Sequence, residues 1–110
     1  MIVEYIRYTV TDERRGRELV AAYDVASEAL RAAPECLGYE LTACEEDSAS
    51  YILRIVWRST EEHLQGFRKG PHFAPFFKAI GGFVKEITEM RHYQLTPVKW
   101  GREGTKSFAA

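Results

Sequence analysis

A few side chains of this sequence are suited to chemistry on a small molecule. Trp57 ends a run of β-branched and aromatic residues, YILRIVW, and could stack on a flat ring while its indole N–H orients an oxygen. His72 follows Gly70-Pro71 and could act as a general base, because the pKa of histidine lies near neutrality. His92 lies in a strand-like segment, facing either a pocket or a subunit interface. The competing interpretations are ordinary core packing for Trp57 and a capping or structural role for His72.

Arg54 is a charged residue inside an otherwise apolar strand-like run. A guanidinium there could hold an oxyanion or a carboxylate. Alternatively, it could pair across a sheet with Glu4, Glu40 or Glu89. Tyr93 is a second candidate for steadying an anion.

No metal site or cofactor is expected. The three histidines, His63, His72 and His92, fall on different predicted elements, and no close Cys/His ligand pair exists. His63 lies in a polar turn, where we expect it to be exposed. The sequence contains no phosphate-binding glycine loop, flavin fingerprint or serine-nucleophile motif.

Composition limits the class of protein. The chain has 110 residues, which suits one domain, and its net charge of −1 gives no basic surface for nucleic acid. We expect the cluster Arg14, Arg15 and Arg17 to be a solvated face. No signal peptide or membrane span is indicated.

The two cysteines, Cys36 and Cys44, lie in one predicted strand. Eight residues of strand separate them by about 26 Å, at about 3.3 Å per residue, which is too far for a disulfide bond. Free thiols indicate a reducing compartment, so we expect the protein in the cytoplasm.

Hydrophobic periodicity predicts the order β-α-β-β-α-β, which is typical of an α+β, ferredoxin-like antiparallel sheet with helices on one face. The predicted segments are a strand at 2–10, a helix at 11–33, strands at 36–44 and 51–57, a short helix capped by Ser59, a helix from Pro71 to Ile80 and a strand at 84–95. Residues 1–96 form the predicted domain. Residues 97–110 are an expected irregular tail, which could lie over a partner subunit.

The strand at 51–57 carries apolar residues on both faces. Leu53 and Ile55 point one way, and Ile52 and Val56 point the other way. Because helices cover only one face of such a sheet, the second face needs another partner. A second copy packed sheet against sheet is the expected solution, and we therefore predict a homodimer.

Short motifs resemble the antibiotic biosynthesis monooxygenase family, namely VWRSTEE at 56–62, GPHF at 70–73 and CLGYE at 36–40. The segment MRHY at 90–93 is similar to actinobacterial forms, some of which occur joined to a truncated globin. The resemblance implies a dimeric α+β barrel with one pocket per subunit. It also implies oxidation of phenolic polycyclic compounds or quinols by molecular oxygen without flavin, heme or metal, although some relatives degrade heme.

The sequence departs from heme-degrading relatives at two positions. Ile6 stands where those relatives have an asparagine, and Phe77 stands near their heme-ligating histidine. Many ordinary members also have a histidine where Phe67 falls. Only Trp57 matches the heme-degrading trio, which makes heme degradation a distant third hypothesis.

We therefore predict a cofactor-independent monooxygenase for a small aromatic, quinol or anthrone-like substrate. Trp57 would position the substrate, His72 or His92 would handle the proton, and Arg54 or Tyr93 would steady the anion. The alternative is a non-catalytic small-molecule-binding or accessory module, for example the partner of a truncated globin. The absence of a decisive acid–base pair and the loss of histidine at 67 favour this alternative.

Overall fold

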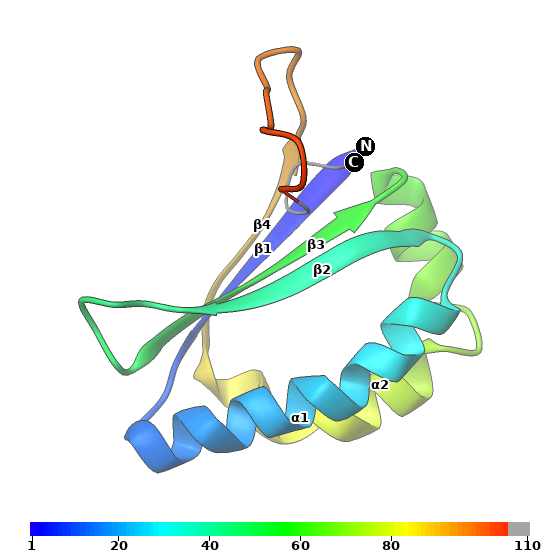
Figure 1. Ribbon diagram of the computed structural model, residues 1–110. Helices are drawn as coiled ribbons and strands as arrows, with labels where there is room; N and C mark the ends of the chain where they lie inside the picture. Colours follow the sequence, from blue (N-terminus) through cyan, green and yellow to red (C-terminus); the bar gives the residue numbers. More distant parts are fainter. Residues whose placement is uncertain (106–110) are drawn as a thin grey trace.

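The four strands form one antiparallel sheet in the order β2-β3-β1-β4. The computed structural model describes residues 1–105. Figure 1 shows the helices packed on one face of this sheet, which confirms the predicted α+β, ferredoxin-like fold. The elements are β1 (Ile2–Thr9), α1 (Glu13–Ala32), β2 (Cys36–Ala43), β3 (Ser50–Trp57), η1 (Glu62–Phe67), α2 (Phe73–Ile80), η2 (Gly81–Glu86) and β4 (Ile87–Gln94).

The register of the central strand β1 decides which side chains face the helices. Glu4 lies opposite Ile55 of β3 on one side and His92 of β4 on the other. Because successive side chains alternate between faces, these three residues share the helix-covered face. Tyr5 lies opposite Arg54 on the uncovered face, which we call the open face.

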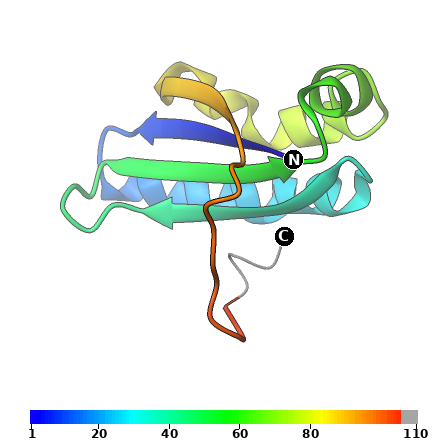
Figure 2. The same ribbon diagram turned by 90° about the horizontal axis from the view of Figure 1, so that it is seen from above.

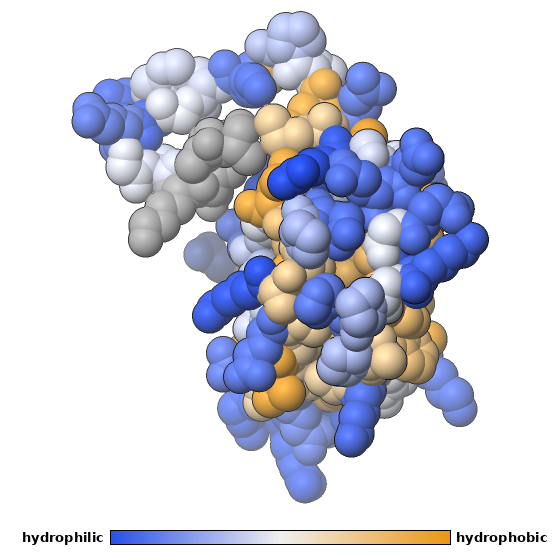
Figure 3. Space-filling model, turned by 90° about the vertical axis from the view of Figure 1, so that its right-hand side faces the viewer, coloured by the Kyte–Doolittle hydropathy of each residue, from blue (hydrophilic) through white to orange (hydrophobic). Residues whose placement is uncertain are grey.

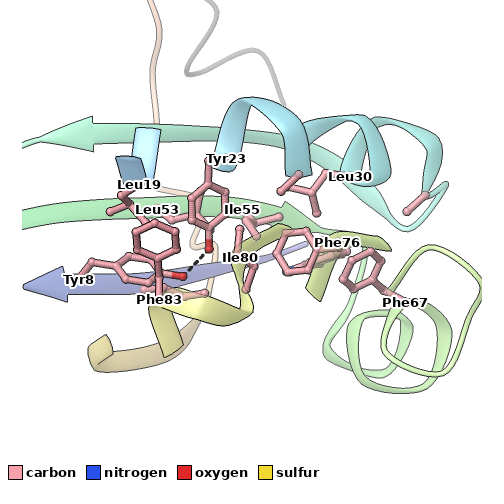
Figure 4. Close-up of a cluster of buried hydrophobic side chains, with 14 of the residues drawn as sticks. Tyr8, Leu19, Tyr23, Leu30, Leu53, Ile55, Phe67, Phe76, Ile80 and Phe83 are labelled. Carbon is pink, nitrogen blue, oxygen red and sulfur yellow. Dashed lines mark hydrogen bonds between the residues drawn. The ribbon is translucent and has the colours of Figure 1, made fainter. Parts of the chain in front are cut away.

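The core lies between the sheet and the helices. Leu19 and Leu30 of α1 and Leu53 of β3 belong to this core, and all three are fully buried. The hydroxyls of Tyr8 and Tyr23 are hydrogen-bonded to each other inside this core (Figure 4), so neither buried hydroxyl lacks a partner.

The segment between β3 and β4 departs from the predicted boundaries. Ser59 caps the first helical turn as expected, since its Oγ accepts a hydrogen bond from the backbone N–H of Glu62 at 3.0 Å. Pro71 is not the first helical residue, because α2 begins at Phe73. The chain continues past Ile80 as the 3₁₀ turn η2, which buries Phe83, so β4 begins only at Ile87.

Residues 97–105 form an irregular arm after β4. The arm rises on the open-face side of the sheet in both ribbon views (Figures 1 and 2) and projects beyond the body of the domain (Figure 3). Val98 and Trp100 are largely exposed on it. The remaining tail residues, 106–110, lie outside the described part of the chain.

The cysteines and the helices can be compared with what the sequence predicted about disulfide bonds and membrane spans. Cys36 and Cys44 are both free. Within residues 1–105, no helix has both the length and the apolar character needed to cross a membrane.

Candidate active site

A cavity of about 170 Å³ lies between the helix-covered face of the sheet and the helices η1 and α2. Its walls are mainly aromatic and aliphatic. Figure 4 shows the rings of Phe67 and Phe76 pointing towards Ile55 from the helical side. Phe67 packs edge-on against Phe76, with ring centroids 5.4 Å apart. Such a wall suits the face and edges of a small aromatic ring.

One end of the cavity is polar. The Glu4 carboxylate lines it and accepts a hydrogen bond of 3.0 Å from the indole Nε1 of Trp57. The His63 ring stacks on the Trp57 indole, with centroids 4.4 Å apart. Nδ1 of His63 lies 3.1 Å from Nε2 of His92, within hydrogen-bonding distance. Glu4 and His63 are buried, whereas the His92 side chain is 29% exposed, so this cluster connects the cavity with solvent.

The helix η1 places His63 in this cluster. Its backbone has the wider π-helical turn, in which the N–H of Arg68 donates to the carbonyl oxygen of His63 at 3.1 Å. His63 and Phe67 are both buried and both contact the Trp57 ring. Single π-helical turns are frequent at functional sites.

Burial changes the proton affinity of this polar end. Burial raises the pKa of Glu4, although the Trp57 hydrogen bond, His92 and Arg68 oppose this shift. Burial, together with the nearby His92 and Arg68, lowers the pKa of His63 to about 4. His63 is therefore neutral near pH 7.

The mouth of the cavity is partly open to solvent. Phe77, Val84 and Met90 line the cavity and are each more than 40% exposed. Arg68 is also exposed and lines the same cavity, and its guanidinium makes a weak contact of 3.9 Å with the sulfur of Met90. Its guanidinium can therefore meet an anionic group at the mouth.

The structure brings together only some of the predicted site residues. Trp57 lines the cavity, and His92 reaches its polar end through His63 and Glu4. His72 is the N-cap residue of α2 and does not line the cavity.

The other two predicted site residues lie on the open face, away from the cavity. Arg54 pairs with Glu40, with 3.4 Å between guanidinium nitrogen and carboxylate oxygen, which is one of the predicted cross-strand pairs. The Tyr93 ring packs edge-on against Tyr5.

Sequence reasoning missed Glu4, His63 and Arg68. The expected exposure of His63 was wrong, because the residue is only 3% exposed. Histidines on different elements were also expected not to share a site, yet the rings of His63 and His92 meet. The alternation of β1 could have identified Glu4, since it falls on the same face as the buried Ile6 and Tyr8.

Among residues 1–105, Glu4, His63 and His92 are also the one group of three side chains whose donor atoms could hold a metal ion. One ligand atom from each residue lies within 4.8 Å of the others.

Comparison with known proteins identifies relatives of this architecture. A family model described as antibiotic biosynthesis monooxygenase matches residues 1–79. A solved structure from Bordetella bronchiseptica, assigned to the same family, has a TM-score of 0.70 and 23% identity over 86% of this chain and 96% of that chain. SnoaB from Streptomyces nogalater, a cofactor-independent oxygenase, has a TM-score of 0.69 and 17% identity over 89% of this chain and 97% of that chain. At these identities, the two structures show the common fold.

One curated protein, YczJ of Bacillus subtilis, is 25% identical over 56 residues. The match covers 51% of this chain and 59% of YczJ, less than two thirds of that protein's length.

Proposed function

Because the chain belongs to the antibiotic biosynthesis monooxygenase family, we propose that it is a monooxygenase that oxidises a small aromatic, quinol or anthrone-like compound with molecular oxygen. The cavity beside Trp57 is the observation that carries this proposal. A cavity of about 150 Å³ can enclose benzene, so about 170 Å³ suits one ring. A single-ring quinol would fit inside, whereas a fused three-ring anthrone would extend through the mouth.

The chemistry requires a proton acceptor beside an enclosed ring. A ring hydroxyl placed against Glu4 could release its proton there, and the resulting anion could give one electron to oxygen. The substrate radical and superoxide could then combine into a substrate peroxide, which would lose water and leave one oxygen atom in the oxidised product. The protein would supply orientation and charge stabilisation rather than a redox centre. The fold shared with SnoaB, a cofactor-independent oxygenase, is consistent with this mechanism.

The geometry suggests a division of roles. Trp57 would position the ring and the Glu4 carboxylate. Of the two histidines considered as proton carriers, we favour His92, because it contacts both Glu4 and His63, whereas His72 does not line the cavity. Arg68 at the mouth would steady the anion, a role for which Arg54 and Tyr93 lie on the wrong face of one subunit.

The proposal includes a homodimer formed through the open face. Tyr5 and Tyr93 are 37% and 50% exposed there, and the arm carrying Val98 and Trp100 rises on the same side. A second copy would cover these apolar side chains. The two free thiols are consistent with the cytoplasm.

Oxygen uptake tests this function. Purified protein in chelator-containing buffer without flavin should consume oxygen when given a single-ring quinol. Glu4→Gln should lower the rate by about 100-fold or more, as expected for loss of a proton acceptor. Trp57→Phe keeps a ring but removes the indole hydrogen bond, and should lower the rate by roughly tenfold.

Two further variants make the oxygen-uptake assay selective. Cys44→Ser changes an exposed thiol and serves as the matched control. His72→Ala tests the other histidine, and a large loss there would shift the proton role to His72. If folded protein binds the quinol without taking up oxygen above the protein-free rate, the non-catalytic binding module becomes the better description.

A further inference from the structure

The Glu4 carboxylate is buried without a permanent cation beside it. Glu4 is 2% exposed, and its carboxylate accepts a hydrogen bond from the indole of Trp57. Among residues 1–105, the basic side chains with a nitrogen within 4 Å of its oxygens are His63 and His92. A buried carboxylate is costly unless it is paired or coordinates a metal ion.

The three side chains bring one donor atom each to within 4.8 Å of the other two. Nε2 of His63 and Nε2 of His92 lie 3.5 and 3.6 Å from the Glu4 oxygens, which is too long for good hydrogen bonds. With metal–ligand bonds of about 2.0 to 2.2 Å, neighbouring ligand atoms are about 2.8 to 3.6 Å apart. The two separations between histidine Nε2 and the Glu4 oxygens fall in this range.

We propose that Glu4, His63 and His92 form a binding site for one divalent first-row transition-metal ion at the polar end of the cavity. Two imidazoles and one carboxylate are a donor set used by zinc and by non-haem iron. Three protein ligands leave coordination positions open. Since Glu4 and His63 line the cavity, those positions would face it.

The surroundings of the cluster also suit an ion. The three ligands come from β1, η1 and β4, so the site exists only in the folded chain. The Trp57 indole holds one Glu4 oxygen from outside the cluster, as second partners of metal ligands commonly do. The partly exposed His92 gives an ion a route from solvent. Arg68 opposes binding, because its positive charge acts on both Glu4 and His63.

The proposed metal site uses Glu4 and His92, to which the proposed oxygenase assigns proton transfer, but it is measured independently of that activity. Metal binding is measured without substrate, and oxygen uptake is measured with a chelator present. A negative result for metal binding therefore does not decide the oxygenase proposal, and a negative result for oxygen uptake does not decide the metal proposal.

The test uses the full, tag-free chain after removal of metals. Titration with Zn²⁺ should show one ion per chain by calorimetry, and Co²⁺ should give visible absorption bands of a low-coordinate site. His92→Ala should weaken Zn²⁺ binding more than about 100-fold, and Trp57→Phe about tenfold. Arg68→Met should tighten binding, because it removes the opposing charge.

Two controls keep the metal test decisive. The double variant Cys36→Ser, Cys44→Ser should bind as the parent does, because neither thiol belongs to the cluster. Glu4→Gln is nearly isosteric and provides a second ligand variant, with thermal melting to confirm that it folds. Absence of stoichiometric binding, binding unchanged in both ligand variants, or binding lost in the double cysteine variant would each overturn the proposal.

Discussion

Trp57 connects the apolar and polar parts of the cavity. Its ring packs against Phe67, its face stacks on His63, and its N–H holds Glu4. The residue type and its place at the end of an apolar strand were enough to select it from the sequence. Glu4 and His63 were not predicted as site residues, because their place in the site depends on burial and on contacts between distant segments. Residue type alone does not indicate either.

At the residue scale, His63 should make stability depend on pH. The folded chain holds this histidine neutral down to about pH 4, whereas the unfolded chain protonates it below about pH 6.5. The free energy of unfolding should therefore decrease by at most about 3 kcal/mol as the pH falls from 6.5 to 4. Urea unfolding in chelator-containing buffer at pH 4 to 7 measures this change, and His63→Phe, which keeps the ring stacking, should flatten it.

Glu4 acts in the opposite direction, and its variant provides the control. Burial raises the pKa of Glu4, so its contribution to stability is lost as pH rises above 4.5. In Glu4→Gln, the fall in stability towards acid pH should accordingly be steeper than in the parent protein. An acid response that stays the same in His63→Phe would contradict the assignment.

At the scale of elements, the sequence indicated the order of strands and helices because each has a clear period. It did not indicate the π-helical turn of η1 or the 3₁₀ turn η2, because both are set by what they bury against the sheet. Arg15 shows the same limitation. We expected it to be a solvated residue, yet its guanidinium lies 3.8 Å from the Phe83 ring centroid and 2.7 Å from the Glu86 carboxylate.

Arg15 should therefore stabilise the packing of α1 against η2. Its Nη2 also donates to the carbonyl oxygen of Gly82 at 2.8 Å, and its three hydrogen bonds to Glu86 are charge-assisted. We expect Arg15→Ala to lower the melting temperature by several degrees. Arg14→Ala, on the same helix with an 82% exposed side chain, should change it by about one degree or less. Equal effects of the two variants would show that the contacts of Arg15 add nothing.

At the scale of the whole molecule, the open face and the arm carry exposed apolar side chains that a single subunit does not cover. The two-faced apolar pattern of β3 predicted a partner from sequence, and the exposed Tyr5 and Tyr93 are consistent with one. The resemblance implied one pocket per subunit, but the size of the cavity could not be predicted from the sequence. It depends on how completely the phenylalanines of η1 and α2 fill the space over the sheet.

The dimer proposal predicts a change in mass. Tyr5→Glu places a charge in the middle of the open face and should convert the dimer to a monomer in light scattering coupled to gel filtration. Val25→Glu makes a comparable change at a 63% exposed position on α1 and should leave the dimer intact. A parent protein that runs as a monomer would rule out the open face as a subunit interface.

The central claim is that a small aromatic ring occupies the cavity beside Trp57. Methyl NMR under anaerobic conditions, with a single-ring quinol as the probe, measures this directly. Ile6, Ile55 and Met90 line the cavity, whereas Ile52 lies on the open face. The account predicts that the methyl resonances of the three cavity residues shift on titration while that of Ile52 stays in place. No shift at saturating quinol, or a shift confined to Ile52, would contradict it.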